Sequence, residues 1–234
     1  MITPSVKPAY LVLADGTFLV GNSFGYRGKA FGEVVFNTGM TGYQEVLTDP
    51  SYYGQLVTFT YPELGNIGVN EFDQESAYPS VKGVIAREVS FEPSNWRSTN
   101  SFQNWLEENK VIGIYGIDTR ALVRHLRDYG SMNGVISSDN DCSPEKLLDQ
   151  LSSFPSMQGL NLAKEVSTNK PYSWTQTTSV DFDKRIKNET KFPYRVVVID
   201  FGVKKSILER LVSYGCELEV LPYKTDISTV MSHR

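Results

Sequence analysis

The sequence has 234 residues, of which 40% are hydrophobic and 12% aromatic, and its formal net charge is -4 at pH 7. A chain of this length and composition can bury a substantial core, in one large domain or two smaller ones. The slight acidity and the lack of Lys/Arg blocks argue against a nucleic-acid surface, so small molecules or protein partners are expected.

The N-terminal stretch MITPSVKPAYLVLADG contains two prolines and only a six-residue apolar run. It lacks the charged region and the longer apolar region of a secretory signal. No stretch approaches the roughly 20 apolar residues that cross a bilayer, and two distant cysteines do not make a disulfide framework. We therefore expect a cytoplasmic protein without a membrane segment.

The first half of the chain is predicted to be rich in strands. Residues 9–21 are expected to form a hairpin with Asp15-Gly16 at its turn. Short β-prone runs bounded by turn residues predict further strands at 33–37, 55–61, 83–86, 111–115 and 134–137, and residues 55–61 alternate as strands do.

The segment between the strands at 33–37 and 55–61 is predicted to be a functional loop. Gly39 and Gly42 allow a bend with positive φ. Pro50 keeps Asp49 extended, so the hydroxyl of Ser51 is presented from a stiff turn. Polar loop residues on a rigid scaffold often form sites. The other interpretation is an ordinary turn, in which the Ser51 hydroxyl bonds to nearby backbone.

Three helices are predicted in the same part of the chain. The first, at 101–109, follows Asn100 as a cap with Gln103 three residues later, and the third, at 145–154, starts after Ser143-Pro144. The second, at 119–129, is capped by Asp118 and stopped by Gly130, and its one apolar face comprises Leu122, Leu126 and Tyr129. Mixed strands and helices indicate an α+β domain of about 150 residues.

Residues 154–193 are rich in polar residues with poor periodicity, and they are predicted to connect two domains while packing along a surface. From residue 194 the runs VVVID, KKSILERLVSYG and CELEVLP predict a β-α-β unit, whose helix carries Ile207, Leu208 and Leu211 on its face. Asp200-Phe201-Gly202 is interpreted as the strand-to-helix turn, because no other kinase motif accompanies it.

No residue of the chain is predicted to be catalytic, and no metal or cofactor site is predicted. Cys142 precedes a helix cap and Cys216 lies where a helix gives way to a strand, so both are interpreted as structural. His125 lies beside the apolar stripe of its helix and is expected to be packed or hydrogen-bonded. His233, near the end of the sequence, is expected to be frayed.

Residues 36–70, FNTGMTGYQEVLTDPSYYGQLVTFTYPELGNIGVN, resemble the signature segment of the small, glutamine-hydrolysing subunit of carbamoyl-phosphate synthase. The similarity continues through GVIAREVS at 83–90, GIDTRALVRHLRDYGSMNGVI at 116–136 and VVVIDFGVKKSILERLVSYGC at 196–216. It covers nearly the whole chain.

The resemblance implies a layered β/β/α domain of the swivelling type at 1–153, the connecting segment at 154–193, and the first β-α-β unit of a flavodoxin-like class I glutamine amidotransferase domain at 194–234. In that domain a cysteine on a Gly-x-Cys-x-Gly elbow attacks the glutamine amide, assisted by a histidine and a glutamate. No such elbow occurs in this sequence. The chain therefore resembles a C-terminally truncated member, and we expect it to be inactive alone.

The family's Thr-Asp-Pro-Ser motif implies that Ser51 binds L-glutamine. The resemblance also implies a large-subunit partner that combines ammonia with bicarbonate, so ATP and a divalent metal are expected on that partner and not here. The alternative is an inactive chain that serves only as a subunit-docking module. A coding region that continues into the elbow and a downstream His-x-Glu would favour the enzyme.

Overall fold

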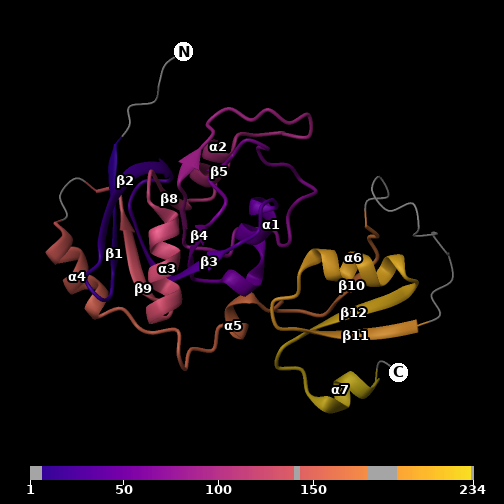
Figure 1. Ribbon diagram of the computed structural model, residues 1–234. Helices are drawn as coiled ribbons and strands as arrows, with labels where there is room; N and C mark the ends of the chain where they lie inside the picture. The colour runs from indigo at the N-terminus through magenta and orange to yellow at the C-terminus, as the bar shows by residue number, and fades with distance from the viewer. Residues whose placement is uncertain (1–6, 140–142, 179–193, 233–234) are drawn as a thin grey trace. The chain divides into compact units, whose positions relative to one another are not determined.

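The computed structural model describes residues 7–139, 143–178 and 194–232, which fall in two compact units, 1–160 and 161–234 (Figure 1). Unit 1 contains β1 (Pro8–Leu13), β2 (Phe18–Gly25), β3 (Lys29–Asn37), α1 (Tyr43–Thr48), the 3-10 turn η1 (Pro50–Tyr52), β4 (Leu56–Phe59), β5 (Glu63–Leu64), β6 (Gly83–Ile85), β7 (Glu88–Val89), α2 (Phe102–Glu108), β8 (Ile112–Tyr115), α3 (Thr119–Tyr129), β9 (Met132–Ser137) and α4 (Pro144–Ser152). Unit 2 contains α5 (Ala163–Val166), β10 (Tyr172–Trp174), β11 (Tyr194–Asp200), α6 (Lys205–Ser213), β12 (Cys216–Pro222) and α7 (Ile227–Ser232).

The strands of unit 1 close into a barrel in the order β1-β2-β8-β6-β4-β3-β9. β3, β4, β6 and β8 pair in parallel, whereas the pairs that involve β1, β2 or β9 are antiparallel. β9 lies between β1 and β3. The prediction of a mixed α and β domain dominated by strands in the first half is confirmed.

The predicted hairpin is confirmed in β1 and β2. The N–H of Leu13 donates to the carbonyl of Thr17 at 2.9 Å, and Gly16 takes φ 87° at the turn. A side chain at Gly16 would be strained in this left-handed conformation, so the Asp-Gly pair suits the turn.

β4 is a central strand whose four residues are all buried. Leu56 packs in the core with Ile85 and Ile114, and Val57 and Phe59 pack in a second core under α2. Successive side chains of the strand predicted at 55–61 therefore face two different cores, because a parallel strand that is covered on both sides has no face exposed to solvent.

The short helix α1 occupies part of the segment that the sequence predicted as a loop. It starts after Gly42, which has φ 79°. The side-chain amide of Gln44 exchanges two hydrogen bonds with the backbone of Asn70, at 2.7 and 3.0 Å. A six-residue helix is marginal by itself, so these long-range bonds stabilise it.

α2 is one residue shorter at each end than predicted and has a different cap. Ser101, and not Asn100, accepts the N–H of Asn104 with its hydroxyl at 3.2 Å. The side chain of Asn100 instead bonds to the N–H of Ser101 and to the carboxylate of Glu108. Both residue types can cap, and the chain enters the helix one residue later than expected.

α3 is confirmed with both of its predicted ends. Asp118 accepts the N–H of Ala121 at 3.0 Å, and Gly130 follows the last turn. Leu122 and Leu126 are buried against the barrel, but Tyr129 is 75% exposed, so its assignment to the buried face is wrong. Tyr129 ends the helix, and its ring lies on that of His125 instead of on the core.

α4 starts where the sequence predicts, with Ser143 as its cap and Pro144 in its first turn. Its buried residues Leu147 and Leu151 pack on Val12 and Val135 of the barrel. α4 lies beside β1 and β9 (Figure 1), whereas α3 contacts β3 and β4. Residues 154–160, which the sequence assigns to the connection, belong to unit 1.

Unit 2 contains the predicted β-α-β unit, in which β11 and β12 are parallel and α6 connects them. Leu208 and Val212 of α6 are buried, whereas Ile207 is 46% exposed, so the helix face is rotated from the predicted one. The connecting segment adds β10, which pairs antiparallel with β12. Tyr172 and Trp174 of this segment pack against the core of unit 2, and residues 179–193 lie outside the described part of the chain. No helix of the described residues is long and apolar enough to cross a membrane.

Candidate functional site

Ser51 lies in the tight connection between α1 and β4. Asp49 ends α1 in an extended conformation with ψ 119°, as Pro50 at the next position requires. The carboxylate of Asp49 accepts the backbone N–H of Ser51 at 2.8 Å. The predicted stiff turn is present, as a single 3-10 turn opened by Asp49 and Pro50.

The hydroxyl of Ser51 is available to a ligand. Ser51 is exposed, and its hydroxyl makes no hydrogen bond to any residue that the structure describes. The local bond of this turn uses the backbone N–H of Ser51, so the interpretation of the hydroxyl as a simple turn partner is not supported. A serine hydroxyl both donates and accepts, so it suits a polar group such as an amide.

The Ser51 turn is fixed by a neighbouring loop. The hydroxyl of Thr48 accepts the N–H of Glu75 at 2.9 Å, and the hydroxyl of Ser76 donates to the carbonyl of Thr48 at 2.6 Å. The N–H of Ser80 donates to the carbonyl of Leu47 at 2.9 Å. These bonds connect residues about 30 positions apart, so they hold the turn in a defined conformation.

A small cavity of about 70 Å³ lies beside the other half of the signature segment, among Met40, Tyr43, Phe59 and Tyr61. A cavity of this size admits only a few water molecules or a small polar group. Ser51 does not line this cavity. This cavity therefore lies beside Gly39 in the bend and apart from Ser51.

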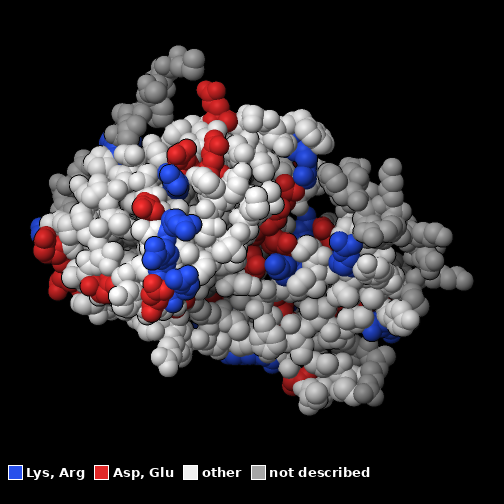
Figure 2. All heavy atoms as spheres, in the orientation of Figure 1, with Lys and Arg blue, Asp and Glu red and all other residues white. Residues whose placement is uncertain are grey.

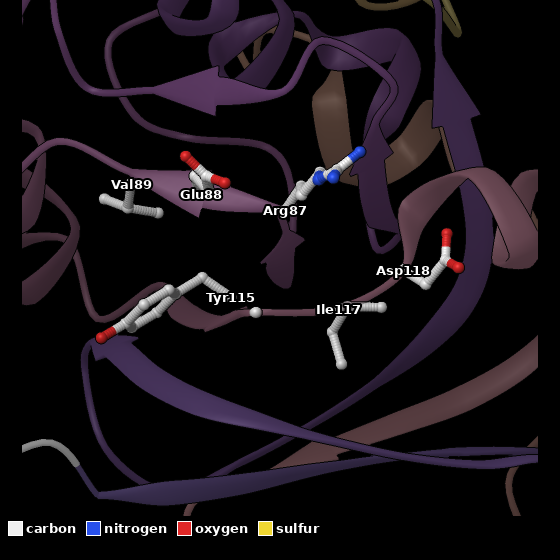
Figure 3. A pocket seen from close by; sticks show the side chains of 7 residues that line it. Arg87, Glu88, Val89, Tyr115, Ile117 and Asp118 are labelled. Carbon is white, nitrogen blue, oxygen red and sulfur yellow. The ribbon is translucent and has the colours of Figure 1, made fainter.

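A larger cavity of about 560 Å³ lies where the chain leaves the parallel strands β6 and β8 (Figure 3). Arg87, Glu88 and Val89 follow β6, and Tyr115 to Asp118 end and follow β8. In Figure 3 Val89 and Tyr115 lie at one end and Asp118 at the other, with Arg87 between Glu88 and Asp118. Ligand sites of parallel sheets often lie outside the carboxyl ends of the strands.

The sequence interpretation did not identify this larger cavity. Its residues come from two segments that meet only because β6 pairs with β8, and the N–H of Gly116 donates to the carbonyl of Arg87 at 2.9 Å. The sequence feature that could have indicated the cavity is the charged pair Arg87-Glu88, close after the buried apolar strand β6. The cavity can bind charged groups, since it offers one guanidinium and two carboxylates.

The histidines and cysteines that the sequence analysis considered have structural roles where the structure describes them. Nε2 of His125 lies 2.6 Å from Oδ2 of Asp15, which confirms a hydrogen-bonded histidine. Cys216 is buried at the start of β12. Cys142 and His233 lie outside the described residues.

The Asp200-Phe201-Gly202 triplet is confirmed as a strand-to-helix turn. The carboxylate of Asp200 accepts the N–H groups of Gly202 and Val203, both at 2.9 Å, and the N–H of Thr168 at 2.6 Å. Gly202 has φ 96°. The Asp200 carboxylate therefore organises backbone, which is a structural task.

A family model described as the carbamoyl-phosphate synthase small chain, CPSase domain, matches residues 11–136. These residues include most of the barrel, from within β1 to within β9, together with the Ser51 turn and the larger cavity. The chain belongs to the family of carbamoyl-phosphate synthase small chains.

Curated relatives agree with this assignment. The chain is 61% identical to the carbamoyl phosphate synthase small chain of Parasynechococcus marenigrum over 99% of its own length, and 56% identical to that of Synechocystis over 98%. It is 44% identical to the Escherichia coli small chain over 97% of its length. In each comparison the chain spans 60% of the relative's length. An aminopeptidase from Aneurinibacillus, at 12% identity and a TM-score of 0.35 over 93% of this chain and 52% of that one, is too dissimilar to bear on the fold.

Proposed function

We propose that this chain acts as the small chain of glutamine-dependent carbamoyl-phosphate synthase, in which glutamine hydrolysis supplies ammonia to a large chain. Two findings support the proposal: the family match over residues 11–136 and the identities of 44 to 61% to chains of that name. The product serves pyrimidine and arginine biosynthesis, and we place the protein in the cytoplasm with these pathways.

Within this function, Ser51 is proposed to bind L-glutamine. The exposed hydroxyl on a turn held by Asp49 is the observation that supports it. We assign no catalytic residue to this chain, because Cys216 is buried at a strand start and Cys142 does not stand in a Gly-x-Cys-x-Gly elbow. ATP and a divalent metal are proposed to bind the large chain, which joins the ammonia to bicarbonate.

The finer domain assignment belongs to the same proposal. The parallel strands β3, β4, β6 and β8 and the antiparallel strands β1, β2 and β9 correspond to the two β layers of a swivelling-type domain, with helices as the third layer. The β11-α6-β12 unit corresponds to the start of a flavodoxin-like amidotransferase domain.

The test compares glutamine with ammonia as the nitrogen source. The whole small chain that carries these residues is mixed with a large chain, and carbamoyl phosphate is measured for the Ser51→Ala variant and for a Ser153→Ala control. Loss of one hydrogen bond should raise the KM for glutamine about three- to tenfold, with the ammonia-dependent rate unchanged. An unchanged KM would contradict the role of Ser51.

The same assay separates the alternative, a docking module without hydrolysis. A docking module would bind the large chain but would support synthesis from ammonia only. The 234 residues alone are expected to release glutamate no faster than background, because a covalent route needs an activated thiolate. Turnover that is lost in a Cys142→Ser or Cys216→Ser variant would show that the nucleophile is within these residues.

A further inference from the structure

The solvent face of α3 carries three arginines, Arg120, Arg124 and Arg127, all exposed. At 100° per residue they lie within about 60° around the helix axis. The opposite side of α3 is buried in the barrel core through Leu122 and Leu126. α3 therefore presents a narrow basic stripe to solvent.

This stripe is unfavourable for the helix alone. Arg120 and Arg124 are four positions apart and Arg124 and Arg127 three, and like charges at these spacings repel. Within the described part of the chain, Arg120 and Arg124 have no side-chain hydrogen bond or ion pair. Arg127 pairs only with the adjacent Asp128, at 3.1 Å and with both side chains at least half exposed. The protein as a whole carries a net charge of -4, so a basic face is not a consequence of composition.

The stripe adjoins the larger cavity. Ile117 and Asp118 line that cavity and directly precede α3, and Arg87 on its other side is exposed. Figure 2 shows a column of Lys and Arg side chains on the face where Figure 1 draws α3. The basic stripe therefore adjoins a hollow of mixed charge, in which Arg87 lies with Glu88 and Asp118.

We propose that this face, Arg87 with Arg120, Arg124 and Arg127, docks an acidic surface of the large chain, an inference that rests on the proposed function. Arginine forms bidentate hydrogen bonds with carboxylates and is enriched in protein interfaces. The three α3 side chains span about 10 Å along the axis at 1.5 Å per residue, which matches an extended surface better than one small anion. The net acidic charge disfavours a nucleic acid as the partner.

The test measures binding of the large chain to the whole small chain by titration calorimetry, at low and at physiological salt. The variant is Arg120→Glu with Arg124→Glu. The matched control is Arg27→Glu with Lys146→Glu, which makes the same change in charge at two exposed positions outside the stripe. The stripe variant should bind at least about tenfold more weakly and lose most of the salt dependence, while the control stays within about twofold.

A second variant separates docking from folding. Arg124→Glu alone places opposite charges beside Arg120 and Arg127, so the thermal midpoint should stay the same or rise while binding weakens. Equal affinity of the stripe variant and the unmodified chain would overturn the inference and leave the proposed function standing. No binding by the unmodified chain would contradict both. Binding of a short DNA duplex, but not of the large chain, to the stripe would also overturn the inference.

Discussion

The hydroxyl of Tyr43 donates to the backbone carbonyl of Gly68 at 2.6 Å and so connects the start of α1 to a loop 25 residues later. Tyr43 is 5% exposed, and burial raises the pKa of its hydroxyl well above the usual value. The hydroxyl therefore remains protonated, and a donor, at neutral pH. This bond and the Gln44–Asn70 pair both stabilise the helix that leads to Ser51.

Tyr43→Phe should lower the free energy of unfolding by about 1 to 3 kcal/mol, because the carbonyl of Gly68 loses its buried donor. Urea denaturation at neutral pH measures the change. Tyr78→Phe is the control, since Tyr78 is 75% exposed and should change stability by less than about 0.5 kcal/mol. Equal stability of Tyr43→Phe and the unmodified protein would show that water replaces the donor.

Glu45→Gln should stabilise the protein at neutral pH and not in acid. Burial raises the pKa of the Glu45 carboxyl, and the charges of Asp73 and Glu75 act in the same direction. The folded state thus binds the proton more tightly than the unfolded state does. The resulting stabilisation is present below the unfolded pKa and is lost as the pH rises through the folded pKa.

The measurement for Glu45 is urea denaturation at about pH 4 and about pH 7. The stability difference between Glu45→Gln and the unmodified protein should grow from the first pH to the second. Glu92→Gln, at an exposed position, is the control. A difference that is the same at both values would mean that the charge of Glu45 is not the cause.

Asp15→Asn should remove part of the acid sensitivity of unit 1. Partial burial raises the pKa of Asp15, but hydrogen bonds from Thr17 and the interaction with His125 outweigh it, so the pKa is lowered overall. The stability that the carboxylate contributes is present above the unfolded pKa and is lost as the pH falls through the folded pKa. The stabilities of the two proteins should therefore differ at neutral pH and converge only as the pH falls below the lowered pKa of Asp15. A His125→Gln variant in a double-mutant cycle isolates the pair; a coupling energy of zero would show that Thr17 alone matters.

Gly113→Ala should destabilise unit 1 by about 1 to 3 kcal/mol, because a Cβ there would lie 2.4 Å from the ring of Phe24. The double variant with Phe24→Leu should lose less stability than the sum of the two single variants, since the smaller side chain makes room. Chemical denaturation of all four proteins gives the coupling. Strict additivity would mean that the backbone of β8 moves instead of the ring.

Local signals were sufficient for much of the fold. Asp15-Gly16 predicts the hairpin, and Asp118 and Gly130 predict both ends of α3, because a turn or a cap depends on a few adjacent residues. The predictions that were wrong concern features that depend on contacts between residues far apart in the sequence. α1 depends on Asn70 and Gly68, and the exposure of Tyr129 depends on where the barrel ends beneath the helix.

The candidate site divides in the same way. The Asp49-Pro50-Ser51 sequence predicts a stiff turn at Ser51. It does not predict that the backbone N–H of Ser51, rather than the hydroxyl, donates to the carboxylate of Asp49. The larger cavity needs the pairing of β6 with β8, which brings Arg87 beside Gly116. Neither the pairing nor the closure of the barrel follows from the periodicity of any one segment.

The position of β9 between β1 and β3 determines the order in which unit 1 can fold on the ribosome. β9, at residues 132–137, pairs with Tyr10–Leu13 and with Lys29–Val34, which lie roughly 100 to 130 residues earlier. Until β9 leaves the ribosome, β1 and β3 each expose an unpaired edge, and pairings over such long separations form slowly. The nascent chain therefore passes through a stage with two unpaired strand edges, and a chaperone is expected to bind at this stage. Slow synthesis between residues 37 and 132 would prolong the stage and favour aggregation.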